Sequence, residues 1–174
     1  MTELSPFETT AEISIAFAGF ISIFLVLAAR DGRFSQRDTI SIRTIVVASL
    51  ASVFYAVLPV VLHSLGIDGQ TLWRISSGVV ALASAATWAS MVYHVRALPA
   101  EVRPPLIGFI QITSNVLGAV SFLSLMANAL AWPWAPSGGV HLMAVWMLIG
   151  IAATHFVVLI FQRVLADSST VGPT

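Results

Sequence analysis

Carboxylates and histidines near one end of the apolar segments form the first group of residues in this chain that could do chemistry. Glu8 and Glu12 are four residues apart, so on a helix they share a face. Carboxylates and imidazoles together can bind a divalent metal, and histidine changes charge near neutral pH. We call this group the outer rim; its members are Glu8, Glu12, His63, Asp68, Arg74 and His141. Either His63, His141 and Glu12 are metal ligands, or these polar side chains only mark a membrane surface.

Uncharged polar side chains form a second group, at a similar depth in the other half of the segments. We call it the inner layer; its members are Ser22, Ser52, Thr87, Trp88, Gln111, Asn115 and His155. The depth is counted at about 1.5 Å per residue from the boundary that the arginines mark. Gln111 and Asn115 are one turn apart and continue a stripe of small and polar residues through Ser114, Gly118 and Ser121. The inner layer either bonds helices to one another or lines a polar pocket or water-filled path that opens towards the cytoplasm.

Two histidines on the last apolar segment suggest a haem site. His141 and His155 are fourteen residues apart, which puts them on one helix face about 21 Å apart along its axis. This spacing resembles that of membrane b-type cytochromes, in which a shared helix supplies axial ligands to two stacked haems. The resemblance implies that His63 pairs with His141, and His94 with His155. The chain departs from the pattern because His63, His94 and His141 lie at segment ends, so our main expectation is that the protein carries no cofactor.

The composition excludes several classes of chemistry. The chain has no cysteine, which removes disulfides, thiolate catalysis and cysteine-bound metals, and it has no lysine for Schiff-base chemistry. A net charge of zero gives no basic face for nucleic acid. Neither a zinc-protease motif, nor a nucleophile elbow, nor a phosphate-binding loop is present. We therefore expect a protein that is not an enzyme.

Five long apolar segments must position all these residues. The chain is 57% hydrophobic and 9% charged, with a mean hydropathy of +0.92. The segments cover residues 11–29, 45–65, 72–93, 106–131 and 140–161. Each is about long enough to cross a hydrocarbon core of ~30 Å as a helix, and in lipid the backbone groups must be bonded within the segment. The sequence predicts an all-α membrane protein in which residues 1–174 form a single bundle of five transmembrane helices, with a short flexible tail at 166–174.

The arginines predict the orientation of the bundle. Seven of the eight lie on one side of the predicted helices, namely Arg30, Arg33, Arg37, Arg43, Arg96, Arg103 and Arg163. Arg74 lies on the other side, where Trp73, Trp132 and Trp134 also mark the membrane boundary. The positive-inside rule then puts the N-terminus outside and the C-terminus in the cytoplasm. We expect the protein in a lipid bilayer, the inner (plasma) membrane of a bacterium.

Three functions fit this sequence. The first is a small non-enzymatic membrane protein, homo-oligomeric, that offers an ion or small molecule an uncharged polar pathway or pocket, as a channel or transporter would. The second is a haem-binding electron-transfer subunit. The third is an accessory or structural subunit of a larger membrane complex. Small residues at helical spacing, such as Ser77, Ala81 and Ala85, fit close packing inside a bundle or between protomers.

Overall fold

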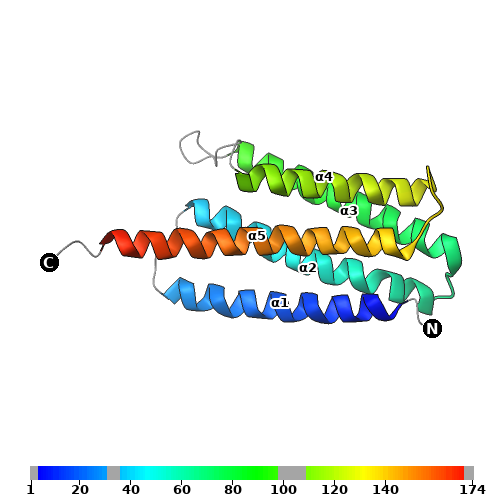
Figure 1. The fold of residues 1–174 in the computed structure, drawn as a ribbon, viewed down its shortest axis with the longest axis horizontal. Helices are drawn as coiled ribbons and strands as arrows, with labels where there is room; N and C mark the ends of the chain where they lie inside the picture. Colours follow the sequence, from blue (N-terminus) through cyan, green and yellow to red (C-terminus); the bar gives the residue numbers. More distant parts are fainter. Residues whose placement is uncertain (1–3, 31–35, 98–108, 171–174) are drawn as a thin grey trace.

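Helices make up all the regular secondary structure in the part of the chain that the structure describes. The structure is a computed structural model that describes residues 4–30, 36–97 and 109–170. The helices are α1 (Ser5–Arg30), α2 (Gln36–Ser64), α3 (Gly69–Arg96), α4 (Phe109–Leu130) and α5 (Gly138–Thr170). They run up and down along one long axis (Figure 1). Residues 166–170 of the predicted tail continue α5, and residues 171–174 lie outside the described range.

Four of these helices are long and apolar enough to cross a membrane. The apolar spans are Ser5–Val26 in α1, Ile42–Ser64 in α2, Ile112–Leu130 in α4 and Gly138–Phe161 in α5. These spans are compatible with an integral membrane protein. The described part of α3 is not among the four spans, and this helix carries Arg74 and several serines and threonines. The fifth transmembrane helix and the orientation of the two termini therefore stay predictions.

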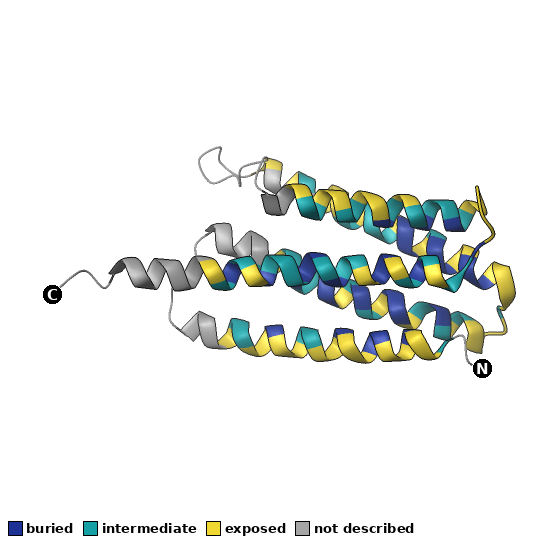
Figure 2. Ribbon diagram, in the orientation of Figure 1, coloured by how far each residue is buried: buried dark blue, intermediate teal, exposed yellow. Residues whose placement is uncertain are grey.

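The helices pack as a group of four with α1 added to one side. α2 packs against α3, α3 against α4, α4 against α5 and α5 against α2, while α1 lies against α2 and α5. Figure 2 shows that each helix turns a buried stripe towards its neighbours and an exposed stripe outwards. On α1 the stripe is formed by Phe7, Ala11, Ser14 and Ile21, at the spacing that keeps side chains on one helix face.

Three hydrophobic clusters follow one another along the bundle. Phe7, Leu72 and Trp73 form the cluster at the end that also contains His141, which we call the His141 end. Tyr55, Val80, Leu125 and Val145 belong to the middle cluster, to which α2, α3, α4 and α5 all contribute. Ile21, Ile45, Phe156 and Leu159 form the third cluster, near Arg43, at what we call the Arg43 end. The bundle is thus closed by apolar packing at several levels.

Two helices end in the same capping motif at the His141 end. At the end of α2 the Ile67 N–H donates to the Leu62 carbonyl at 3.1 Å, and the Gly66 N–H donates to the His63 carbonyl at 2.9 Å. Gly66 has a φ of 84°, the left-handed conformation that this motif requires. At the end of α4 the left-handed position is occupied by Ala131, with a φ of 55°. These caps set the turns that bring α3 and α5 back into the bundle.

Candidate functional site

The most completely connected polar site lies at the His141 end and is centred on His141. The His141 side chain is 0% exposed, and so are those of Ser77 on α3 and Asn128 on α4. His141 Nδ1 is 3.1 Å from the Ser77 hydroxyl, and His141 Nε2 is 3.0 Å from the backbone carbonyl of Tyr55 on α2. Asn128 Nδ2 donates to the Ser77 hydroxyl at 2.8 Å. The network therefore joins four helices through buried side chains.

Asn128 also fixes the turn between α4 and α5. Its Nδ2 donates to the Ser137 carbonyl at 3.1 Å, and its Oδ1 accepts the Ser137 N–H at 2.8 Å. Because a backbone N–H can only donate and a carbonyl can only accept, these two bonds fix which way the Asn128 amide points. The Ser137 hydroxyl in turn accepts the Val140 N–H at 3.4 Å, near the start of α5. One amide therefore ties the end of α4 to the start of α5.

The direction of the hydrogen bonds determines the tautomer of His141. The Tyr55 carbonyl can only accept, so Nε2 carries the proton. The Ser77 hydroxyl oxygen accepts a hydrogen bond from the Asn128 amide, and the Ser77 O–H can donate a hydrogen bond to Nδ1. In this arrangement both ring nitrogens of His141 are hydrogen-bonded to the protein. Because the ring is fully buried, we interpret the network as a connection between helices and not as a catalytic dyad.

Proline explains why the Tyr55 carbonyl needs a partner from another helix. Pro59 lies inside α2, four residues after Tyr55, and has no N–H to donate to that carbonyl. In lipid an unsatisfied backbone group costs several kcal/mol, and neighbouring helices commonly supply the missing bond at such prolines. His141 of α5 supplies it here. The bond therefore attaches α5 to the one turn of α2 that proline opens.

Aromatic rings enclose the histidine. Phe7 stacks on Trp73 with ring centroids 5.3 Å apart, and the His141 ring lies 5.8 Å from Phe7 and 6.4 Å from Trp73. Gly138 makes room for this cluster, because a Cβ atom at that position would lie 2.8 Å from the Trp73 ring. The position next to it, Gly139, faces open space. α1, α3 and α5 thus meet at a closely packed aromatic contact.

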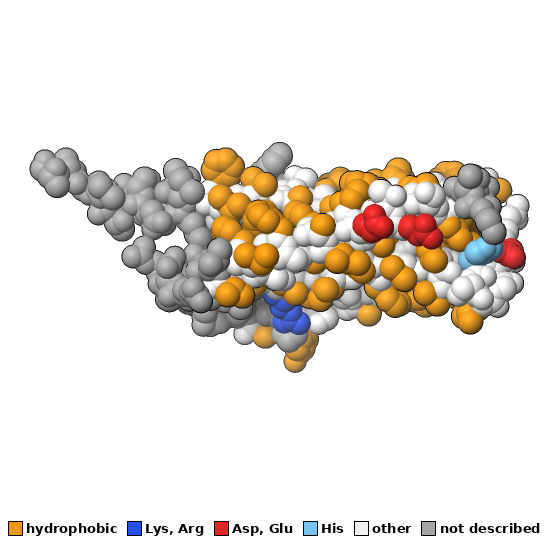
Figure 3. Space-filling view, turned by 90° about the horizontal axis from the view of Figure 1, so that it is seen from below, with side chains coloured by type: hydrophobic (Ala, Val, Ile, Leu, Met, Phe, Trp, Pro, Cys, Tyr) orange, Lys and Arg blue, Asp and Glu red, His pale blue; other side chains and the backbone are white. Residues whose placement is uncertain are grey.

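The structure does not bring the outer rim together. Glu8 and Glu12 are exposed on the face of α1 that points away from the bundle, where Figure 3 shows acidic side chains set among hydrophobic ones. His141, in contrast, is buried between the helices. Among the residues that the structure describes, no three histidine or carboxylate side chains lie close enough to hold a metal ion. The metal and haem hypotheses stay predictions, without a preformed ligand set around His141.

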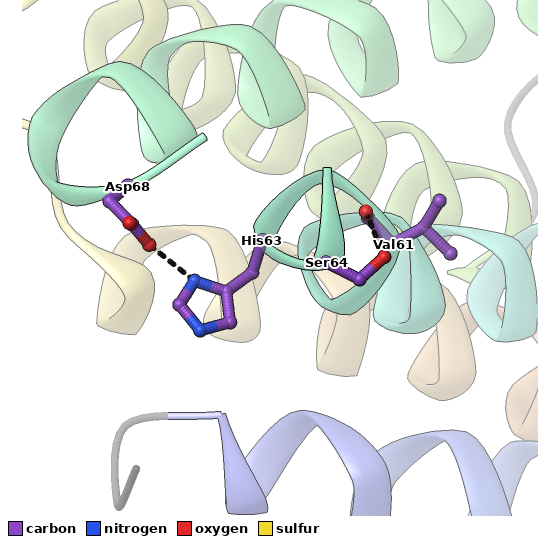
Figure 4. Close-up of polar contacts among 4 residues, drawn as sticks. All are labelled: Val61, His63, Ser64 and Asp68. Carbon is purple, nitrogen blue, oxygen red and sulfur yellow. Dashed lines mark hydrogen bonds and ion pairs between the residues drawn. The ribbon is translucent and has the colours of Figure 1, made fainter. Parts of the chain in front are cut away.

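The remaining rim residues make separate local contacts. His63 Nδ1 pairs with the Asp68 carboxylate across the turn between α2 and α3, while the neighbouring Ser64 hydroxyl donates to the Val61 carbonyl at 2.7 Å (Figure 4). Both His63 and Asp68 are largely exposed. Arg74 Nε donates to the Ala129 carbonyl at 3.2 Å, in the last turn of α4. A cation is favourable there because helix C-termini carry partial negative charge.

The inner layer is divided over several faces of the bundle. The hydroxyl of Ser22 donates to the Ala18 carbonyl at 2.8 Å and the hydroxyl of Ser52 to the Ser49 carbonyl at 2.7 Å, so both are bonded within their own helices. Trp88 and Asn115 are exposed, and Thr87 is half-buried. The side chains of Gln111 and His94 lie outside the described part of the structure.

His155 of the inner layer forms a bond between two helices. His155 Nε2 on α5 lies 3.1 Å from the Ser114 hydroxyl on α4, and both residues are half-buried. The partner is Ser114, a member of the polar stripe on α4. This contact joins α4 to α5 in the half of the bundle opposite His141.

A cleft lies between α2 and α3, towards the Arg43 end of the bundle. Its volume is about 330 Å³. Its lining residues are Arg43, Val47, Ala86, Thr87 and Ser90. The buried stripe of α3 ends at Ala81, and Trp88, two turns further along the same stripe, is 65% exposed. Among the residues that the structure describes, the packing of α3 against α2 therefore becomes looser towards the Arg43 end.

The lining of the cleft combines one cation, two hydroxyls and apolar walls. In the part of the chain that the structure describes, no residue forms an ion pair or hydrogen bond with the Arg43 guanidinium or with the hydroxyls of Thr87 and Ser90. Val47 and Ala86 supply the apolar surface. Five guanidinium donors and two hydroxyls can hold an anionic or strongly accepting group, and the apolar walls can hold a hydrocarbon part.

A second, smaller cavity lies between α1 and α2. Its volume is about 60 Å³ and its lining includes Ser22 and Ser49. The Ser49 hydroxyl is buried and has no hydrogen-bond partner in the described structure. A water molecule needs on the order of 10–15 Å³ of such space together with polar partners. The cavity thus has room for a small polar guest beside this hydroxyl.

Neither hydrogen-bond partner of His141, Ser77 or Tyr55, was recognised as such from the sequence. Arg43 was used only to mark a membrane boundary. Ser77 was considered only as a small residue for close packing, and Asn128 and Pro59 were not considered. A signal for the network was present in Pro59, since a proline inside an apolar segment leaves the carbonyl four residues earlier without its helical donor. Asn128 precedes the short proline-rich turn, where an amide can bond to the backbone.

Comparisons with protein-family models, curated proteins and solved structures found no match to this chain.

Proposed function

We propose that this protein is a small, non-enzymatic integral membrane protein that binds an amphipathic molecule with an anionic head in the cleft between α2 and α3. The observation that carries the proposal is the lining of that cleft. Arg43 supplies a positive charge that no residue in the described part of the chain pairs, Thr87 and Ser90 supply hydroxyl donors, and the walls beside them are apolar. A volume of about 330 Å³ is at the lower end of the range found for small-molecule sites, about 300–1,000 Å³.

The position of the cleft supports a ligand that comes from the membrane. Arg43 is the last arginine or carboxylate along α2, and the rest of that helix is largely apolar, so we place its side chain close to the depth at which lipid head groups meet hydrocarbon. Basic pockets between transmembrane helices on the cytoplasmic side commonly bind anionic head groups. The positive-inside prediction puts the Arg43 end on that side. The head of the ligand would pair with Arg43 while its apolar part lies along Val47 and Ala86.

A pocket fits the structure better than a continuous pathway. At the His141 end the side chains of Phe7, Trp73 and His141 are buried against one another. The polar groups there are bonded to one another and to the backbone, which favours a closed end. We therefore propose binding, storage or presentation of the ligand from the open side, and not conduction across the bundle.

Binding of a lipid-like probe to the purified protein tests this proposal. Native mass spectrometry would compare an anionic phospholipid, phosphatidylglycerol, with zwitterionic phosphatidylcholine of the same chains. We expect preferential retention of the anionic lipid, and a roughly tenfold loss of affinity in Arg43→Gln, since a charge-assisted bond contributes about 1.5–3 kcal/mol. Ala86→Trp, which fills the cleft, is expected to reduce binding of both lipids.

The matched control removes an arginine at the other end of the bundle. Arg74→Gln eliminates the same charge far from the cleft, so anionic-lipid binding to each chain is expected to stay unchanged. Equal retention of both lipids, or equal effects of Arg43→Gln and Arg74→Gln, would remove the cleft as the binding site.

A further inference from the structure

We infer that the exposed face of α1 binds the α3 side of a second copy of this chain, with Glu8 and Glu12 of one copy facing Arg74 of the other. This inference concerns the assembly of the protein and does not rest on ligand binding in the cleft. It starts from the two carboxylates, which lie on α1 inside the span Ser5–Val26 and are both exposed. In the described part of the chain neither of them forms an ion pair or a hydrogen bond.

The surroundings of these carboxylates make a protein partner favourable. Ile15 and Ile23 share the outward face of α1 with them and are 57% and 63% exposed. At the edge of an apolar, lipid-facing surface a carboxylate is partly shielded from water, so pairing with a cation of another protein chain is favourable there. Gly19 lies on the same face, and a Cβ atom there would meet no other atom within 4 Å. A small residue at this position lets a second helix approach closely.

Arg74 has the right charge and the right depth to be the partner. Phe7 and Trp73 stack on each other, so they lie at one level of the bundle. Glu8 follows Phe7 and Arg74 follows Trp73, and both are exposed. Two copies placed side by side in one membrane therefore put Arg74 of one level with Glu8 of the next. Only Nε of Arg74 is bonded to Ala129, which leaves the rest of its guanidinium for a carboxylate.

The arrangement of the helices makes the contact a head-to-tail one. Apart from the contact of Phe7 with Trp73 at the His141 end, α2 and α5 separate α1 from α3 and α4. The exposed α1 face and the α3 side therefore belong to different sides of the molecule (Figure 1). A symmetric pairing of α1 with α1 would bring like charges together, which is unfavourable. Pairing of two different surfaces produces a ring when the rotation closes, and this is the form of oligomer that we infer.

Cysteine cross-linking in membranes tests the contact directly, because the chain has no cysteine of its own. Counting from the level of Phe7 and Trp73, Ile15 and Leu82 lie close in depth, and Leu82 is 71% exposed. Ile15→Cys with Leu82→Cys in one chain is expected to give a ladder of disulfide-linked species on oxidation. A disulfide needs Cα atoms within about 7 Å, and the helices between α1 and α3 prevent one within a chain.

The control pair keeps Ile15→Cys and moves the second cysteine to Leu123 on α4. The hydrogen bond between Asn128 and Ser77 puts these two residues at one depth. Leu123 lies five residues from Asn128 towards the Arg43 end, and Leu82 lies five residues from Ser77 in the same direction, so Leu123 and Leu82 match in depth. Leu123 is 64% exposed. We expect much weaker cross-linking for this pair. The absence of linked species for the first pair, or equal yields for both pairs, would overturn the inference.

A charge exchange tests the role of the ions. Glu8→Arg with Glu12→Arg, and separately Arg74→Glu, should each reduce cross-linking roughly tenfold or more through like-charge contact. A chain that carries Glu8→Arg, Glu12→Arg and Arg74→Glu together should regain cross-linking. The hydrogen bond from Arg74 to Ala129 is lost in this chain and also in the single variant Arg74→Glu, so its loss does not account for a difference between the two. Restoration therefore separates an intermolecular contact from damage to the fold, and failure to restore while tryptophan fluorescence stays native would contradict the pairing.

Discussion

His141 on α5 donates its Nε2–H to the backbone carbonyl of Tyr55 on α2, at 3.0 Å, and Pro59 is the reason that this carbonyl is available. The relationship joins a sequence feature, a proline in an apolar segment, to a contact between helices. It also gives the bundle a defined register, because the donor on α5 has to lie level with one particular turn of α2. Substitutions at both positions can test this dependence.

His141→Leu is expected to lower the free energy of unfolding by about 2 kcal/mol, because it removes bonds to Ser77 and Tyr55 and leaves that carbonyl unpaired. In a Pro59→Ala background, residue 59 regains an N–H for the Tyr55 carbonyl. The cost of His141→Leu should then fall by about 1 kcal/mol. Unfolding by denaturing detergent, followed by tryptophan fluorescence, measures all four proteins of the cycle. Equal costs in the two backgrounds would show that the histidine and the proline are not coupled.

Neighbouring glycines at the start of α5 offer a matched comparison. Gly138→Ala puts a Cβ atom 2.8 Å from the buried Trp73 ring, whereas Gly139→Ala meets no atom within 4 Å. We expect Gly138→Ala to lower stability by about 1–3 kcal/mol and to shift tryptophan emission, as overpacking does. Gly139→Ala should be neutral or slightly stabilising because alanine favours helix. Thermal unfolding of the two variants decides, and similar midpoints would mean that the Trp73 contact tolerates the extra atom.

At the left-handed positions that end α2 and α4, we expect glycine to give a more stable protein than alanine. Ala131 ends α4 in the left-handed conformation, which alanine adopts at a cost of about 1 kcal/mol relative to glycine. Ala131→Gly is therefore expected to stabilise the protein by about that amount. Gly66→Ala, at the equivalent position after α2, is expected to destabilise it by a similar amount. The same unfolding assay checks both, and a loss of stability in Ala131→Gly would contradict the reading of this cap.

The helices could be predicted from the sequence far better than the site. Long apolar segments separated by short polar ones predict helices whatever their partners are, because backbone groups in lipid must bond within the segment. The helices extend beyond the apolar segments, as in α1, which runs from Ser5 to Arg30. α3 carries enough serine and threonine that its status as a span stays a prediction.

Polar contacts depend on the rotation of each helix about its own axis, which depth counting does not supply. Counting placed His141 in the outer rim with Glu8 and Glu12, and the structure buries the histidine while it leaves the two carboxylates exposed. The same counting put Trp88 and His155 in one layer, although Trp88 is exposed and His155 bonds to Ser114. Rotation is set by packing against neighbours, and here it is set in part by the aromatic contact of Phe7 with Trp73.

Two asparagines on α4 lie in different surroundings: Asn128 belongs to the buried network around His141, and Asn115 lies on the exposed polar stripe. Asn128→Leu removes the donor to Ser77 and both bonds to the backbone of Ser137. We expect it to lower stability by about 2–4 kcal/mol, because the Ser137 N–H and carbonyl then lose their partner beside a buried apolar side chain. Asn115→Leu, at an exposed position of the same helix, is expected to lower stability by less than Asn128→Leu does. Hydrogen exchange at the Ser137 amide should rise only in Asn128→Leu, and faster exchange in both variants would assign the effect to α4 as a whole.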